Sequence, residues 1–214
     1  MAPLQTVVAA LVLVVIGIDG EHTKLEWTDC GTDTNAIVLN NVAISPMPIE
    51  VPGNLSLTID AVAKIDINRA NLKVSVKRHT FIGDVTIPCL FHVGSCEYQD
   101  TCTLLDRMEK ENWAGIMGGI GTQVKQMLQS IGITSFCGVT PRSIGIQNYN
   151  LKLPPIPAIL TFFAEGDYTA HVTVEDDATK QQRICLDLKL SIKKHKDTTC
   201  TGWFCGRKRR NVHY

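Results

Sequence analysis

Eight cysteines carry the clearest chemistry in this sequence, because their number and spacing bear on three alternatives: disulfides, a metal site or a nucleophile. In an oxidising compartment an even set of thiols pairs, which here would give four disulfides. A zinc site is not supported, since no CxxC pair occurs and the six histidines show no HxxxH or HExxH spacing. We therefore expect disulfides, with no bound metal and no cofactor. The cysteines are Cys30, Cys89, Cys96, Cys102, Cys137, Cys185, Cys200 and Cys205.

The N-terminus indicates the oxidising compartment. Residues 7–16 are uninterrupted apolar, which is long enough for the apolar region of a signal peptide and too short to span a bilayer. We expect residues 1–20 to be removed and the mature protein to be soluble, in the lysosome or outside the cell. Asn54 opens an Asn-Leu-Ser sequon, so a glycan is expected there on the surface.

Catalytic motifs find little support. The chain has no GxSxG nucleophile elbow, and Gly119-Ile120-Gly121 lacks the third glycine of a dinucleotide-binding loop. The acidic run at 175–177 falls in a predicted turn, where solvated carboxylates are commoner than an acid/base pair. We expect a protein that is not an enzyme.

Charge is distributed unevenly although its formal sum is zero. Residues 193–214 hold seven basic residues and one acid, and with Asp19 in the leader this leaves a net −5 on residues 21–192. The basic run Arg207–Arg210 fits a furin-type processing site, a patch for an anionic membrane or a plain solubilising tail. No nucleic-acid partner is expected.

A period of two dominates the body of the chain. Apolar and polar residues alternate over 54–61, 72–76, 168–174 and 184–192, and Pro/Gly clusters separate these runs. Strict alternation is typical of half-buried antiparallel strands. The expected fold class is therefore all-β, an antiparallel sandwich or cup.

One segment, about residues 113–132, has helical periodicity instead. Its apolar residues form one stripe that begins Trp113, Ile116, Met117, Ile120 and Val124, and glycines weaken its first half. Two interpretations remain open: a helix that buries its stripe on the sheet, or an amphipathic lid over a cavity or against a membrane.

Several ordered motifs resemble a known family. They include EWTDC at 26–30, VPGNLSL at 51–57, Ile87-Pro88-Cys89, Gly94-Ser95-Cys96, and Cys102 with Leu104-Leu105-Asp106. Together they resemble the ganglioside activators, lipid-recognition (ML-type) domains that serve a lysosomal β-hexosaminidase. The resemblance covers about residues 26–192, so the expected domains are a leader at 1–20, a lipid-recognition domain at 21–192 and a basic tail at 193–214.

The resemblance implies a β-cup whose interior holds lipid chains. It implies the disulfides Cys30–Cys185, Cys89–Cys96 and Cys102–Cys137, and it leaves Cys200 to pair with Cys205 outside the shared region. Because Cys185 alternates with Ile184 and Leu186, its bridge is expected on the outer face. The alternative is that the inward residues meet in a solid core. The residues expected to wall the lipid cavity are Leu55, Leu57, Ile59, Leu72, Val74, Val76, Val172, Val174, Leu186 and Leu188.

A lipid-transfer protein must also contact a membrane. The segment 157–164 holds four large apolar residues in a predicted loop, where the family has an apolar membrane-contacting loop; alternatively, Phe162 and Phe163 fill the core. The residues expected at the rim are Ile159, Leu160, Phe162, Phe163, Trp113, Ile116, Met117 and Ile120.

The resemblance thus implies a non-catalytic activator that extracts glycosphingolipid from a membrane surface and presents it to a lysosomal glycosidase. The main alternative is an extracellular lipid-sensing or carrier module without a hydrolase partner. A hydrolase is the third class, and it predicts turnover by the purified protein itself.

Overall fold

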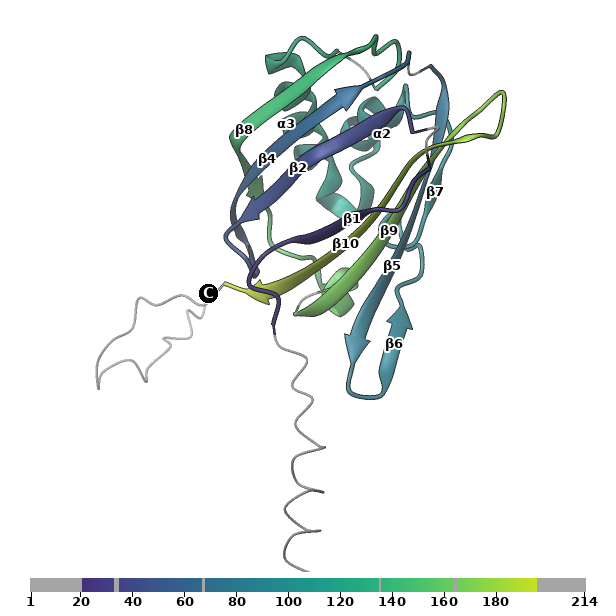
Figure 1. The fold of residues 1–214 in the computed structure, drawn as a ribbon. Helices are drawn as coiled ribbons and strands as arrows, with labels where there is room; N and C mark the ends of the chain where they lie inside the picture. The colour runs from purple at the N-terminus through teal and green to yellow at the C-terminus, as the bar shows by residue number, and fades with distance from the viewer. Residues whose placement is uncertain (1–20, 33–34, 67, 135, 164, 196–214) are drawn as a thin grey trace, which may run out of the picture.

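Two β-sheets face each other, and a pair of helices lies between them at one end (Figure 1). The computed structural model describes residues 21–195 except 33, 34, 67, 135 and 164. The expected signal peptide, Cys200, Cys205 and the basic run Arg207–Arg210 lie outside the described residues.

The larger sheet contains three of the four strands that alternation predicted. Its order is β1 (Glu26–Asp29), β10 (Gln182–Lys194), β9 (Gly166–Asp176), β5 (Ala70–Thr80) and β6 (Gly83–Thr86). These neighbours are antiparallel, whereas the short β3 (Ile49–Val51) runs parallel to the end of β10. The two-residue β7 (Glu97–Tyr98) pairs with the start of β5.

The smaller sheet has three antiparallel strands. They are β2 (Ile37–Ser45), β4 (Gly53–Ala63) and β8 (Arg142–Leu153), in that order. Of these, the alternating pattern had indicated only β4. The prediction of an antiparallel, mainly β fold is confirmed.

The helical region is larger than the sequence predicted. It consists of α2 (Leu104–Glu111), the short 3-10 turn η1 (Trp113–Gly115) and α3 (Met117–Ser130). The helix predicted over about 113–132 is present as α3, and its weaker first part is the turn η1. The sequence did not predict α2, which precedes it; the left-handed backbone of Asn112 (φ 44°) and Ala114 (φ 50°) turns the chain between the two helices. The two helices pack closely at Gly121, because this residue has no side chain: a Cβ built there would lie 3.1 Å from Cβ of Met108 on α2.

Buried side chains gather in two clusters at opposite ends of β8. One joins α2, η1 and the end of α3, through Leu104, Leu105, Met108, Trp113, Leu128 and Ile133. The other joins β3 to the start of β4 and the end of β8, through Ile49, Leu55 and Leu151. The core is therefore not one continuous block of side chains.

Three disulfides are present among the described residues, and they have the pairing that the resemblance implied. Cys30 is joined to Cys185, Cys89 to Cys96 and Cys102 to Cys137. Cys185 pairs across the sheet with Thr173, on the face opposite Ile184 and Leu186. The bridge that ties β1 to β10 therefore lies outside the space between the sheets.

Candidate functional site

The inward faces of β5, β9 and β10 form continuous apolar rows. Register places Leu72 beside Val174 and Val174 beside Ile184, and a second row runs through Val74, Val172 and Leu186. All six side chains are half-buried rather than buried. Side chains that met in a solid core would lose almost all exposure, so the space between the two sheets is incompletely filled.

This space contains a cavity of about 410 Å³ under the two helices. Thr101 is the one polar residue among those that line it. The helices contribute Leu104, Val124, Met127 and Leu128, the smaller sheet contributes Ile37, Leu39, Ile59, Ala61, Ile144 and Ile146, and the larger sheet contributes Leu72, Val174 and Ile184. A volume of this size and lining is typical of sites that bind small apolar ligands.

The residues expected to wall the cavity fall into three groups. Ile59, Leu72 and Val174 line it directly. Further along the same inward faces, and outside its lining, are Val74, Val76, Val172, Leu186 and Leu188. Leu55 is buried in the packed cluster with Ile49, and Leu57 packs against that cluster. Neither lines the cavity, so the expectation that these two form part of its wall was wrong.

Sequence reasoning missed the helical wall and the edge strand β8. Val124, Met127 and Leu128 belonged to the apolar stripe that had been recognised, but the stripe alone did not tell what it faced. Ile144 and Ile146 alternate with Ser143 and Gly145, and this short strand signal could have placed them on an inward face.

Trp113 is a structural residue and does not form part of the rim. Its side chain is only 4% exposed, and its ring stacks on Tyr98 and lies against His92. Its indole N–H donates to Oε2 of Glu111 at 2.6 Å, a hydrogen bond that lowers the pKa of that carboxyl below its usual range. Burial in the helical cluster explains why the expected membrane contact at Trp113 was wrong.

The other rim candidates divide in a similar way. Leu160 is only 2% exposed, so the membrane contact expected there was also wrong. Its neighbour Ile159 is 51% exposed. Both belong to a 3-10 helix, η2 (Ala158–Phe163), where the sequence had predicted a loop. Met117 and Ile120 are half-buried on α3, Ile116 lines a groove described below, and the side chains of Phe162 and Phe163 lie outside the described part.

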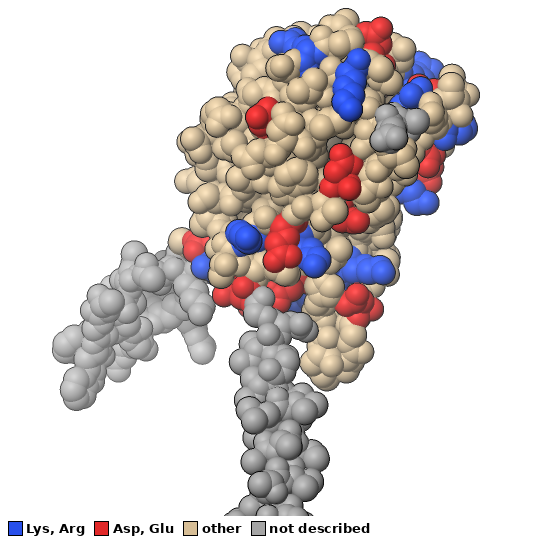
Figure 2. All heavy atoms as spheres, viewed as in Figure 1, with Lys and Arg blue, Asp and Glu red and all other residues tan. Residues whose placement is uncertain are grey.

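The most exposed apolar residues lie at a turn that the sequence did not single out. Phe81 is fully exposed and Ile82 is 77% exposed at the tip of the β5–β6 hairpin, which extends beyond the body of the protein (Figure 1). Figure 2 shows this tip as an uncharged protrusion. The sequence feature that could have identified this exposed tip is an apolar pair directly before Gly83-Asp84, a dipeptide that favours a turn.

The base of the hairpin is fixed to the sheet. His79 on β5 lies opposite Asp84 on β6, with Nδ1 and Oδ1 2.6 Å apart, and its Nε2 is 2.7 Å from Oγ1 of Thr169 on β9. Tyr168, next to Thr169, pairs with Arg78, so η2 and the start of β9 lie at the hairpin end of the molecule. Phe81, Ile82 and Ile159 therefore expose apolar surface at one end.

Two clusters among the described residues bring metal-ligating atoms together. One contains Cys30, His171 and Cys185, and the other contains Asp100, Cys102 and Cys137. In each, the two cysteines form a disulfide. A disulfide sulfur is not the thiolate that binds a metal, so neither cluster is a candidate site.

Substituting the cavity wall tests whether this space binds ligand. We expect Val124→Phe with Val174→Phe to lower the affinity for a fluorescent fatty acid about tenfold or more, because two rings would fill space that an acyl chain needs. The melting temperature should stay the same or rise, since the rings enter a void. Val62→Phe, on the outer face of β4, is the matched control, and unchanged affinity in the double variant would contradict the assignment.

Comparison with known proteins gives two relatives of the same kind. No family model matches the chain. The ganglioside GM2 activator of Mus musculus is 21% identical over 143 residues, which are 66% of this chain and 69% of that protein. The ganglioside GM2 activator of Macaca fascicularis is 25% identical over 116 residues, 49% of this chain and 60% of that protein. The chain resembles the ganglioside activators.

The resemblance predicted from the residues is thereby confirmed, and it supports the lipid-recognition (ML-type) family. Among solved structures, a Niemann-Pick type C2 protein from Japanese carpenter ant matches at 11% identity with a TM-score of 0.38, over 78% of this chain and 99% of that one.

Proposed function

We propose that this protein binds lipid without catalysing a reaction, extracts glycosphingolipid from membranes and presents it to a lysosomal glycosidase. The observation that carries the proposal is the apolar cavity between the sheets. The sequence similarity of the chain to the ganglioside GM2 activators supports the same function.

The size of the cavity bounds what it holds. A methylene fills about the volume that a water molecule takes in the liquid, about 30 Å³, so 410 Å³ accommodates roughly a dozen methylenes. At about 0.8 kcal/mol for each methylene removed from water, one buried chain contributes about 10 kcal/mol. A second chain would lie along the half-buried rows of β5, β9 and β10 that extend from the cavity.

The exposed apolar end supports the membrane step of the proposal. Phe81, Ile82 and Ile159 are all exposed at the hairpin end, and exposed apolar surface often marks a contact site. Across residues 21–195, the gaps aside, no helix is both long and apolar enough to cross a bilayer. We propose that the protein docks transiently through this end and takes up lipid from the surface.

The sulfur chemistry supports a role without catalysis. Every cysteine among the described residues is in a disulfide, so none of them supplies a nucleophilic thiolate. Lining residues of the cavity include no carboxyl, imidazole or amine. In this proposal the chemistry belongs to the partner glycosidase, and the protein supplies a route for the lipid out of the membrane. The expected signal peptide and the disulfides support a location in the secretory pathway or the lysosome, where the proposed partner would also act.

Native mass spectrometry of the secreted protein tests lipid binding directly. We expect a mass shift that corresponds to one amphiphilic molecule and is lost on denaturation. Liposomes containing a radiolabelled ganglioside should then lose label to the protein in solution. A protein that carries no lipid and extracts none would overturn the proposal.

Stimulation of β-hexosaminidase on the same liposomes separates the two functional alternatives. An increase in ganglioside turnover supports the activator role. Extraction without any increase would instead favour a lipid carrier that has no hydrolase partner.

A further inference from the structure

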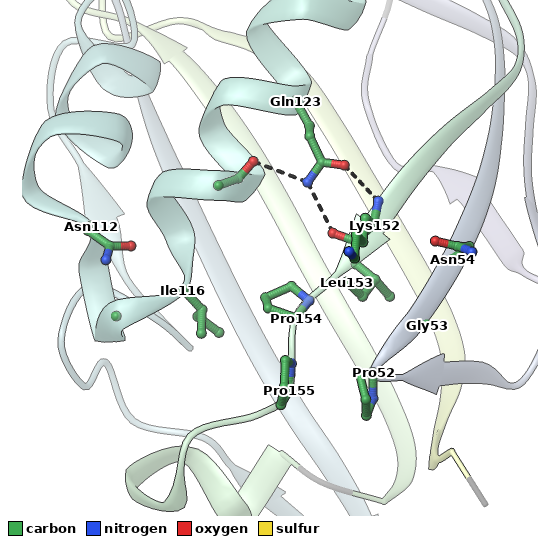
Figure 3. Close-up of a pocket in the computed structure, with 12 residues that line it drawn as sticks. Pro52, Gly53, Asn54, Asn112, Ile116, Gln123, Lys152, Leu153, Pro154 and Pro155 are labelled. Carbon is green, nitrogen blue, oxygen red and sulfur yellow. Dashed lines mark hydrogen bonds between the residues drawn. The ribbon is translucent and has the colours of Figure 1, made fainter. Parts of the chain in front are cut away.

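A second hollow, separate from the apolar cavity, lies between the helical region and the smaller sheet. It is a groove of about 700 Å³ between the first turn of α3, the start of β4 and the end of β8 (Figure 3). Ile116, Leu153 and three prolines, Pro52, Pro154 and Pro155, give it an apolar lining, and Lys152 is the one charged residue among those that line it.

The helical wall of the groove is bare. A Cβ built on Gly119 would meet no atom within 4 Å, so this position leaves room for a bulky side chain from elsewhere. The wall is also held in place, because the amide of Gln123 on α3 donates to the backbone oxygen of Lys152 at 3.0 Å and accepts from its N–H at 2.6 Å. The groove is thus a fixed slot that nothing in the described part of the chain fills; its lining is mainly apolar, with the polar side chains of Asn54, Asn112 and Gln123 at its walls.

The C-terminal end of the described chain leads to this groove. Lys194 at the end of β10 pairs with Val51 on β3, and the N–H of His195 donates to the backbone oxygen of Val51 at 3.1 Å. Val51 directly precedes Pro52, which lines the groove. The described chain therefore ends, at His195, beside one wall of the groove.

The sequence that follows has the chemistry to fill an apolar slot. Residues 198–206 carry no charge, and Trp203 and Phe204 stand between Cys200 and Cys205. Trp203 is eight residues beyond His195, a distance along the chain that reaches at most about 28 Å. A tether of this length gives an effective concentration in the millimolar range, so even a weak contact would be populated.

We propose that Trp203 and Phe204 dock in this groove and cover it in the same molecule. Aromatic rings and prolines recognise one another through flat apolar faces, and the groove presents three prolines. Closing a Cys200–Cys205 ring would hold the two aromatics together and reduce the entropy lost on docking. The docked segment would tie α3 to β4 and β8, three elements that also wall the lipid cavity.

Photo-cross-linking tests this contact in the full-length secreted protein. Benzoylphenylalanine in place of Phe204 should cross-link within one molecule to the peptides that contain Ile116 or Leu153–Pro155. The same probe at Asn211 is the control for random collision. Cross-links elsewhere on the body, or covalent dimers that indicate a second copy as the occupant, would overturn the proposal.

Filling the groove provides the second arm of the test. Gly119→Leu should lower the cross-link yield at least about fivefold, because its side chain would occupy the slot. Gly145→Leu on β8 is the matched control, since a Cβ there also meets no atom within 4 Å and Gly145 does not line the groove. An equal yield in both variants would exclude the groove as the docking site, whether or not the protein binds lipid.

Discussion

Replacing Phe81 and Ile82 by serine will weaken binding to lipid vesicles by about 100-fold or more. The two side chains are 100% and 77% exposed in the free protein, so nearly all of their apolar surface is available to a bilayer. Each contributes about 1.5–3 kcal/mol when it leaves water, and every 1.4 kcal/mol is a factor of ten in affinity. Sedimentation with neutral phosphatidylcholine vesicles measures the loss without a contribution from vesicle charge.

The matched control for the hairpin is Phe91→Ser. Phe91 is 54% exposed and lies in the loop closed by Cys89–Cys96, outside the hairpin tip. It should leave vesicle binding nearly unchanged. If the double hairpin variant keeps wild-type binding and an unaltered melting temperature, the membrane contact lies elsewhere.

Removing the Cys30–Cys185 disulfide will destabilise the protein by about 5 kcal/mol, the largest effect expected of any single bridge. The two cysteines are 155 residues apart, and on chain-entropy arithmetic a bridge that closes so long a loop restricts the unfolded chain strongly. The folded state loses an anchor as well, because β1 is an edge strand that the bridge holds to β10. Denaturant unfolding of Cys30→Ala with Cys185→Ala measures the change.

The short Cys89–Cys96 bridge provides the comparison. It closes a loop of sequence separation 7, for which the same arithmetic gives about 2.5 kcal/mol. Cys89→Ala with Cys96→Ala should therefore shift the unfolding midpoint about half as far. Equal shifts would show that loop length does not determine how much these bridges stabilise the fold.

Much of the fold could be predicted from the sequence because one physical signal dominates it. Strands β4, β5, β9 and β10 each present one apolar face, and alternation identifies such strands without reference to their partners. The helix α2 was missed because its eight residues give only two turns of periodicity. Gly121 was interpreted as a weakness of α3, whereas the structure shows it as the place where α2 packs closely.

The candidate site was harder to predict, because alternation tells which residues face inward but not whether they meet. Leu55 and Leu72 look alike in the sequence, yet one is packed in a filled cluster and the other lines the cavity. Phe81 and Ile82 gave no periodic signal, since only the pairing of Thr80 with Gly83 makes them the two-residue tip of a hairpin. Leu160 shows the converse, an apolar residue in a predicted loop that the structure buries.

The described chain begins and ends on the side that carries the hairpin. The N–H of His22 donates to Oγ of Ser191 near the end of β10, and Ile192 pairs with Gly166 at the start of β9. Both ends of residues 21–195 therefore leave the body near the surface proposed to meet the bilayer. An affinity tag or fluorescent fusion at either terminus would stand between the protein and the lipid, so probes of docking belong on the β9–β10 turn at the far end.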